Sequence, residues 1–227
     1  MKDIIIVGAS GFGKEVLQLL NRINKENTCW SILGFIDDNP KLSGITINNQ
    51  SVIGGVESLK NFSCCSVVIA VTDPSLKLSL ISKINSYGND FNFPNIIHPN
   101  VEMSLALNQI GHGNIITEGC ILTSNIKIGN FNVFNTRTSI GHDVAINDYN
   151  IMNPNVQISG NVIIGSSNFF GVNSVILQGL KIGSNNHIGA CSLVVRNMRD
   201  DMNVFGKRVM TSRDLIGRCK NSLMIRI

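Results

Sequence analysis

Residues 128 to 151 read IGNFNV FNTRTS IGHDVA INDYNI, and the same six-residue spacing runs from Ile110 to Val194. Glycine comes directly after the first residue of the hexad at seven of fifteen positions, and Asn, Ser and Thr fill much of the remainder. Because these residues favour turns, the pattern predicts one short strand and one turn in every hexad. Every first residue is large and apolar: Ile110, Ile116, Leu122, Ile128, Phe134, Ile140, Ile146, Met152, Ile158, Ile164, Phe170, Ile176, Ile182, Ile188 and Val194.

A period of six fits neither the 3.6-residue turn of a helix nor the alternation of a hairpin strand. Three short strands joined by three turns, however, close one triangular coil. The fifteen hexads therefore predict five coils of a parallel β-helix with the apolar residue inside. At a strand spacing of about 4.8 Å this prism would be roughly 24 Å long.

Residues 1–95 show a different pattern, in which apolar strand candidates alternate with helical stretches. This alternation predicts a small parallel α/β sheet covered by helices on both faces. We therefore divide the chain into a Rossmann-like α/β domain, residues 1–95, and a β-helix domain with a C-terminal tail, residues 96–227. The expected strands are 4–7, 33–36 and 67–71, and the expected helices are 14–23 and 75–84.

Three loops of the first domain follow strands directly, at the carboxyl ends where open α/β sheets bind ligands. The turn from Gly8 to Gly13 opens a helix, so its backbone N–H groups could bind a phosphate. Its order is GxxGxG rather than GxGxxG, and a tight turn without a ligand is the alternative. The pair Asp37-Asp38 suits a ribose hydroxyl or a sugar amine, with an Asp-rich turn before Pro40 as the alternative. The third loop is Thr72-Asp73-Pro74.

Among the four histidines, only His142 lies next to an acid, Asp143, and one residue after a glycine. An imidazole with a carboxylate neighbour can act as a general base, and an exposed turn histidine is the alternative. We assign structural positions to His98, which precedes Pro99, and to the other two, His112 and His187. The sequence has no GxSxG, HExxH or Walker A motif and no metal-ligand spacing, so we expect no metal.

The hexads, the opening stretch IVGASGFGKE, the strand end GFIDD and the stretch Ile140 to Asp143 together resemble the NeuD/PglD-like family of sugar acetyltransferases. The resemblance covers nearly the whole chain, to about Arg208. It implies a left-handed β-helix, although the usual crossover rule would predict the opposite hand. It also implies a homotrimer with active sites between neighbouring β-helices, which transfers an acetyl group from acetyl-CoA to a nucleotide sugar.

The same resemblance implies a role for individual residues. His142 would be the general base and Asp143 the acid that orients it, with a backbone N–H of a neighbouring coil stabilising the oxyanion. The implied contacts of the nucleotide sugar are Ser10, Gly11, Phe12, Asp37, Asp38, Thr72 and Ser75. Those of acetyl-CoA are Asn150, Val172, Ala190, Lys207 and Arg208.

Two positions depart from the pattern of the family. Relatives commonly carry a second histidine where this chain has Asn150, which can form hydrogen bonds but cannot take a proton at neutral pH. The stretch Phe205 to Arg208 replaces a Gly-x-Pro-Ala-Lys type of loop. Lys207 and Arg208 would still suit CoA phosphates, and a solvated basic tail is the alternative.

The composition narrows the function further. A net charge of +4 and 6% aromatic residues do not favour nucleic-acid binding. Without a membrane-length apolar run or a signal-peptide layout, we expect a cytoplasmic protein. The preferred function is N-acetylation of a UDP- or dTDP-linked 4-amino-4,6-dideoxy sugar for a surface polysaccharide or glycan. The alternatives are O-acetylation of sialic acid and a noncatalytic trimeric scaffold or nucleotide sensor.

Overall fold

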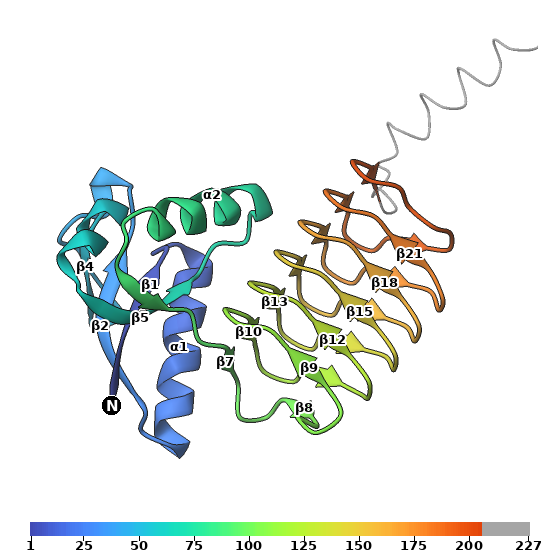
Figure 1. The fold of residues 1–227 in the computed structure, drawn as a ribbon, viewed down its shortest axis with the longest axis horizontal. Helices are drawn as coiled ribbons and strands as arrows, with labels where there is room; N and C mark the ends of the chain where they lie inside the picture. The colour runs from blue at the N-terminus through green and yellow to red at the C-terminus, as the bar shows by residue number, and fades with distance from the viewer. Residues whose placement is uncertain (206–227) are drawn as a thin grey trace, which may run out of the picture.

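The computed structural model describes residues 1–205, which form an α/β domain followed by a β-helix (Figure 1). The α/β domain contains one six-stranded sheet in the order β3-β4-β2-β1-β5-β6. No helix within these 205 residues is long and apolar enough to cross a membrane. The strands are β1 (Lys2–Val7), β2 (Trp30–Ile36), β3 (Thr46–Ile47), β4 (Gln50–Gly54), β5 (Cys64–Ile69) and β6 (Asp90–Asn92), and the helices are α1 (Gly11–Glu26), α2 (Pro74–Asn85) and the 3-10 helices η1 (Pro40–Leu42) and η2 (Val56–Asn61).

The central strands are continuously apolar because both faces of the sheet are covered. Ile4 and Ile6 pack with α1 on one face, whereas Ile5 and Val7 pack with α2 on the other. The sheet differs from the expected all-parallel arrangement at one edge, where β3 runs antiparallel to β4. The turn between them, Asn48-Asn49, has positive φ values of 47° and 66°. A two-residue hairpin turn needs this conformation, and asparagine tolerates it well.

The six-residue repeat is confirmed as a parallel β-helix with three faces. The first face comprises β7 (Ile96–Ile97), β10 (Ile115–Ile116), β13 (Val133–Phe134), β16 (Ile151–Met152), β19 (Phe169–Phe170), β22 (His187–Ile188) and β24 (Asn203–Val204). The second face comprises β8 (Glu102–Met103), β11 (Ile121–Leu122), β14 (Ser139–Ile140), β17 (Gln157–Ile158), β20 (Val175–Ile176) and β23 (Leu193–Val194). The third face comprises β9 (Gln109–Ile110), β12 (Lys127–Ile128), β15 (Ala145–Ile146), β18 (Ile163–Ile164) and β21 (Lys181–Ile182).

The interior of the prism is formed by the repeated apolar residue. Fourteen of the fifteen predicted positions are buried in one core cluster, and Ile110 packs partly buried against it. The repeat also extends beyond the predicted range, because Ile97 and Met103 add to the start of the prism and Met198 and Val204 to its end. These were missed because Met103 to Ile110 spans seven residues and Val194 to Met198 spans four.

We name the three edges of the prism by the faces that they join. The first corner joins the first and second faces, the second corner joins the second and third, and the third corner joins the third and first. Most turns place one residue in the left-handed region, such as Asn125, Asp143 and Asn161 at the second corner, with φ values of 57° to 59°. Asparagine and glycine tolerate this conformation, as at Asn125 and Gly113. The glycines that directly follow the apolar residue have another role. At Gly141, for example, a Cβ would lie 2.6 Å from the backbone nitrogen of Gly160 in the next coil.

The α/β domain lies against the first face and also contacts the corners that border this face (Figure 1). Outward residues of that face, Ile115, Val133 and Ile151, share a core cluster with Val16 and Leu19 of α1. Helix α1 therefore lies between its own sheet and the prism, as Figure 1 shows. Because the second corner is opposite the first face, it is the edge farthest from the α/β domain.

Candidate active site

His142 and Asp143 form an ion-pair geometry on the second corner. Nδ1 of His142 lies 2.7 Å from Oδ2 of Asp143, and the two side chains are 54% and 47% exposed. Asp143 adopts a φ of 57°, which turns its carboxylate back toward the preceding imidazole. The contact fixes the orientation of the ring and leaves Nε2 available to accept a proton.

Residues of the adjacent coils support this pair, although the sequence pattern alone does not mark them as site residues. Nδ2 of Asn125, one coil earlier, donates to Oδ1 of Asp143 over 3.2 Å. The hydrogen bonds from His142 first and Asn125 second lower the pKa of the Asp143 carboxyl, so this group stays ionised at neutral pH. Gly160, one coil later, leaves room for the ring, because a Cβ there would lie 2.6 Å from Nε2 of His142. An 18-residue step from each member of the pair would have found both.

In the glycine turn before α1, close packing requires glycine at two positions, Gly8 and Gly13, and leaves Gly11 open. Gly8 has a φ of +105°, and a Cβ there would lie 2.7 Å from the Ala70 carbonyl oxygen. Gly13 packs still more tightly on the Gly8 carbonyl, whereas a Cβ on Gly11 would meet nothing within 4 Å. Ser10 is the N-cap of α1 but its side chain forms no capping hydrogen bond. The turn therefore leaves Ser10 and Gly11 accessible to a ligand.

The carboxyl ends of the strands border a cavity of about 150 Å³, which Gly8, Asp37, Asp38, Val71 and Leu76 help to line. Both carboxylates are held by backbone N–H groups. Asp37 accepts from Ala9 over 2.8 Å and from Asn39 over 2.9 Å, and Asp38 accepts from Val56 over 2.7 Å. Each carboxylate keeps further acceptor capacity for a ligand.

Of the other expected substrate contacts, Thr72 and Ser75 lie beside this cavity, whereas Phe12 is in the core. Thr72 is half-buried and Ser75 is exposed, and they directly flank the lining residues Val71 and Leu76. Phe12 is only 8% exposed and packs in the core with α1. Only its backbone is therefore in a position to contact a ligand.

Val172 and Ala190 lie on consecutive coils at the first corner. The N–H of Cys191 donates to the Val172 carbonyl over 2.8 Å, and both candidate residues are exposed. Both side chains are apolar, so this part of the first corner exposes a small apolar edge. Lys207 and Arg208 lie outside the described residues.

The assignment of Asn150 to acetyl-CoA is wrong for its side chain, which is fully buried. Asn150 belongs to a ladder of asparagines at 18-residue spacing. It donates to Oδ1 of Asn132 over 3.2 Å and to the Gly165 carbonyl over 2.9 Å. Its own Oδ1 accepts from the backbone N–H of Asn168 over 3.0 Å. These bonds satisfy the amide within the prism, so no polar atom remains for a ligand.

The structure brings some of the predicted residues together and separates others. The carboxyl ends of the central strands β1 and β2 bring together Ser10, Gly11, Asp37 and Asp38. His142 lies on the corner opposite the face that this domain covers. Within one chain, the expected sugar-nucleotide site and the expected base are therefore on different sides of the prism. Among residues 1–205, no group of His, Cys, Asp or Glu is arranged to hold a metal ion.

A parallel β-helix that follows an N-terminal α/β domain resembles one class of proteins, the left-handed β-helix acyltransferases. Within that class, residues 3–84 match the family model of the PglD N-terminal domain. A search of curated protein sequences gives no match.

Solved structures match the chain over nearly its whole length. The acetyltransferase domain of PglB from Neisseria gonorrhoeae FA1090, in complex with acetyl coenzyme A, is 25% identical, with a TM-score of 0.82 over 90% of this chain and 96% of that one. WeeI from Acinetobacter baumannii AYE is 26% identical, with a TM-score of 0.61 over 91% and 97%. A mutant perosamine N-acetyltransferase from Caulobacter crescentus, with CoA and GDP-perosamine, is 22% identical, with a TM-score of 0.81 over 91% and 94%. These matches confirm the fold and the resemblance to NeuD/PglD-like sugar acetyltransferases.

Proposed function

We propose that this protein transfers the acetyl group of acetyl-CoA to the amine of a nucleotide-linked 4-amino-4,6-dideoxy sugar, in the synthesis of a surface polysaccharide or glycan. The observation that carries the proposal is the exposed His142 ring, oriented by Asp143 over 2.7 Å on a prism of the acyltransferase type. The PglB domain that matches the chain contains acetyl coenzyme A, and the matched perosamine enzyme contains CoA and GDP-perosamine. Both ligands agree with the proposed substrates.

The chemistry needs one base and no covalent enzyme intermediate. The amine attacks the thioester carbonyl while Nε2 of His142 accepts the proton that the amine loses. The ionised Asp143 stabilises the imidazolium that forms, because it accepts the Nδ1–H. Collapse of the tetrahedral intermediate forms the amide bond and releases CoA as its thiol, to which His142 can return the proton.

We further propose that the active site forms between copies in a homotrimer. The α/β domain covers the first face, and His142 lies on the opposite corner of the same prism. A sugar held by the α/β domain therefore needs the base of a neighbouring copy. Cyclic trimers present one such heterologous contact per subunit.

The test is an acetyl-transfer assay that follows the release of free CoA thiol and the mass of the sugar product. The acceptors are GDP-perosamine, UDP- and dTDP-linked 4-amino-4,6-dideoxy sugars, and free sialic acid. We expect transfer to one of the nucleotide-linked amino sugars. We also expect His142→Asn to lower kcat by about 10² to 10⁴ while acetyl-CoA still binds. Acetylation of sialic acid alone, or wild-type turnover by the variant, would contradict the proposal.

A further inference from the structure

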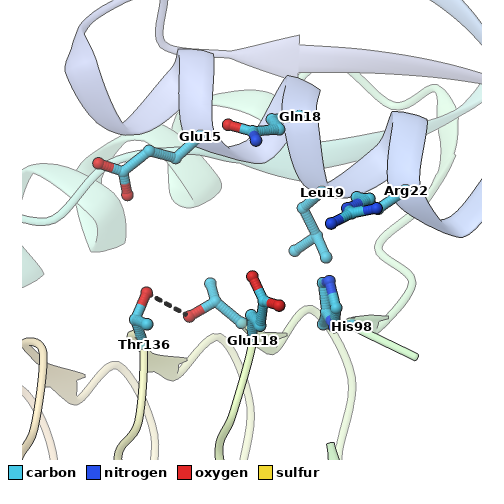
Figure 2. Close-up of a pocket in the computed structure, with 8 residues that line it drawn as sticks. Glu15, Gln18, Leu19, Arg22, His98, Glu118 and Thr136 are labelled. Atoms are coloured by element: carbon cyan, nitrogen blue, oxygen red, sulfur yellow. Dashed lines mark hydrogen bonds between the residues drawn. The ribbon is translucent and has the colours of Figure 1, made fainter. Parts of the chain in front are cut away.

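A second cavity, of about 140 Å³, lies between helix α1 and the first corner of the prism (Figure 2). From α1 it is lined by Glu15, Gln18 and Arg22, and from the β-helix chiefly by His98, Glu118 and Thr136. Figure 2 shows the polar ends of these side chains on both sides of the gap between the two domains. None of these residues lines the cavity at the carboxyl ends of the strands or belongs to the His142 pair.

His98 supplies an unsatisfied donor to this cavity. The side chain is 6% exposed, and its Nδ1 accepts the backbone N–H of Asn100 over 3.1 Å. In the neutral ring the proton is therefore on Nε2. Within residues 1–205, Nε2 is buried and has no hydrogen-bond partner. A buried N–H without an acceptor is costly, so a ligand oxygen in the cavity would remove a penalty that the protein otherwise carries.

One face of α1 connects this cavity to the glycine turn. Gly11, Glu15, Gln18 and Arg22 follow the spacing i, i+4, i+7 and i+11, which places them on one side of a helix, and all four are exposed. The rise of an α-helix places Glu15 about 6 Å from Gly11 along the axis. A diphosphate bound at the open Gly11 position would therefore hold its attached group over this face and beside the cavity.

The lining favours a ligand with hydroxyl and amino groups. The two carboxylates, Glu15 and Glu118, outnumber the one guanidinium, that of Arg22, so the cavity does not favour a simple anion. The hydrogen-bond donors of Arg22 and His98 likewise do not favour a bare metal cation. Sugar hydroxyls both donate and accept, and a sugar amine donates to carboxylates. We propose that this cavity binds the sugar ring of the nucleotide-linked amino sugar, with Glu15, Glu118 and the Nε2–H of His98 as hydrogen-bonding partners. The inference rests on the proposed function.

The test separates the sugar from its nucleotide. Isothermal titration calorimetry would compare GDP-perosamine with GDP, or whichever nucleotide sugar the protein acetylates with its own nucleoside diphosphate. We expect Glu15→Gln and Glu118→Gln to weaken binding of the nucleotide sugar about tenfold or more, because each loses a charge-assisted hydrogen bond. Binding of the free nucleotide and of acetyl-CoA should remain within about twofold of wild type.

Two further variants make the result decisive. Gln18→Trp fills the cavity from an exposed helix position and should abolish binding of the nucleotide sugar but not of the nucleotide. Glu26→Gln, exposed at the far end of the same helix, is the matched control and should bind both like the wild type. If the cavity variants bind the nucleotide sugar like the wild type, or weaken both ligands equally, the inference is wrong. If the wild type binds no nucleotide sugar, the proposed function fails as well.

Discussion

At the scale of single residues, the His142 ring depends on the absence of a side chain one coil away. A Cβ on Gly160 would lie 2.6 Å from Nε2 and 2.8 Å from Cε1, so Gly160→Ala must displace the ring. We expect kcat to fall about tenfold or more, because a small misplacement of a base is costly, with little change in stability. Steady-state kinetics and urea unfolding would measure both effects. Gln178→Ala, one coil further along the same corner, is the control and should keep wild-type kinetics.

The residue scale also shows where the sequence was informative about the site. His142 and Asp143 are neighbours in the chain, so their contact could be predicted from the sequence. Asn125 and Gly160 reach the same site only through the 18-residue coil. His98 and Glu15 line one cavity only because α1 packs on the first face. The error at Asn150 has the same origin. The position of an asparagine in a turn does not reveal whether it faces solvent or the ladder.

At the scale of elements, the repeat determined most of the β-helix. A period of six with one apolar residue admits few alternatives, so the β-helix was predictable strand by strand between Ile110 and Val194. Its first and last coils were not, because steps of seven and four residues break the period while the backbone still pairs. The β3-β4 hairpin was not predicted, for a different reason. Strand β3, Thr46–Ile47, is too short to show alternation, and only the Asn48-Asn49 turn indicates it.

The asparagine ladder is held by buried hydrogen bonds between successive coils. Replacing Asn150 with Leu would leave the Asn168 N–H and the Gly165 carbonyl without partners inside the prism. We expect a loss of about 2–5 kcal/mol in the free energy of unfolding, measured with urea. Asn147→Ala, at an exposed position nearby, should cost less than about 1 kcal/mol. If Asn150→Leu kept its stability but bound acetyl-CoA more weakly, the Asn150 side chain would contact the coenzyme after all, contrary to the structure.

At the scale of the whole molecule, Lys77 joins the two domains. It is 1% exposed, its Nζ donates to the Phe131 carbonyl over 3.2 Å, and burial lowers its pKa to about 7. In the unfolded chain a lysine titrates near pH 10.4, so between about pH 7 and pH 10 the folded protein binds fewer protons. The free energy of unfolding should therefore rise with pH across this range.

Urea unfolding at about pH 7 and about pH 9.5 would measure this slope. Lys77→Met removes the titrating group, so its stability should rise less than that of the wild type over the same interval. Lys127→Met, at an exposed position on the third face, should keep the wild-type slope. An equal slope in Lys77→Met and wild type would show that this lysine is not the group responsible.

The separation of the two half-sites makes a last prediction about the assembly. Copies with His142→Asn keep the α/β site, whereas copies with Gly11→Trp keep the base but carry a bulky side chain at the open position of the glycine turn. Each variant alone should be inactive. If every active site joins the α/β domain of one copy to the second corner of the next, randomly mixed trimers combine two intact halves at about one site in four. The mixture, dissociated and reassembled together, should then regain about a quarter of wild-type acetyl transfer. A mixture that stays inactive, although the two variants form mixed trimers, would place both halves of the site within one chain.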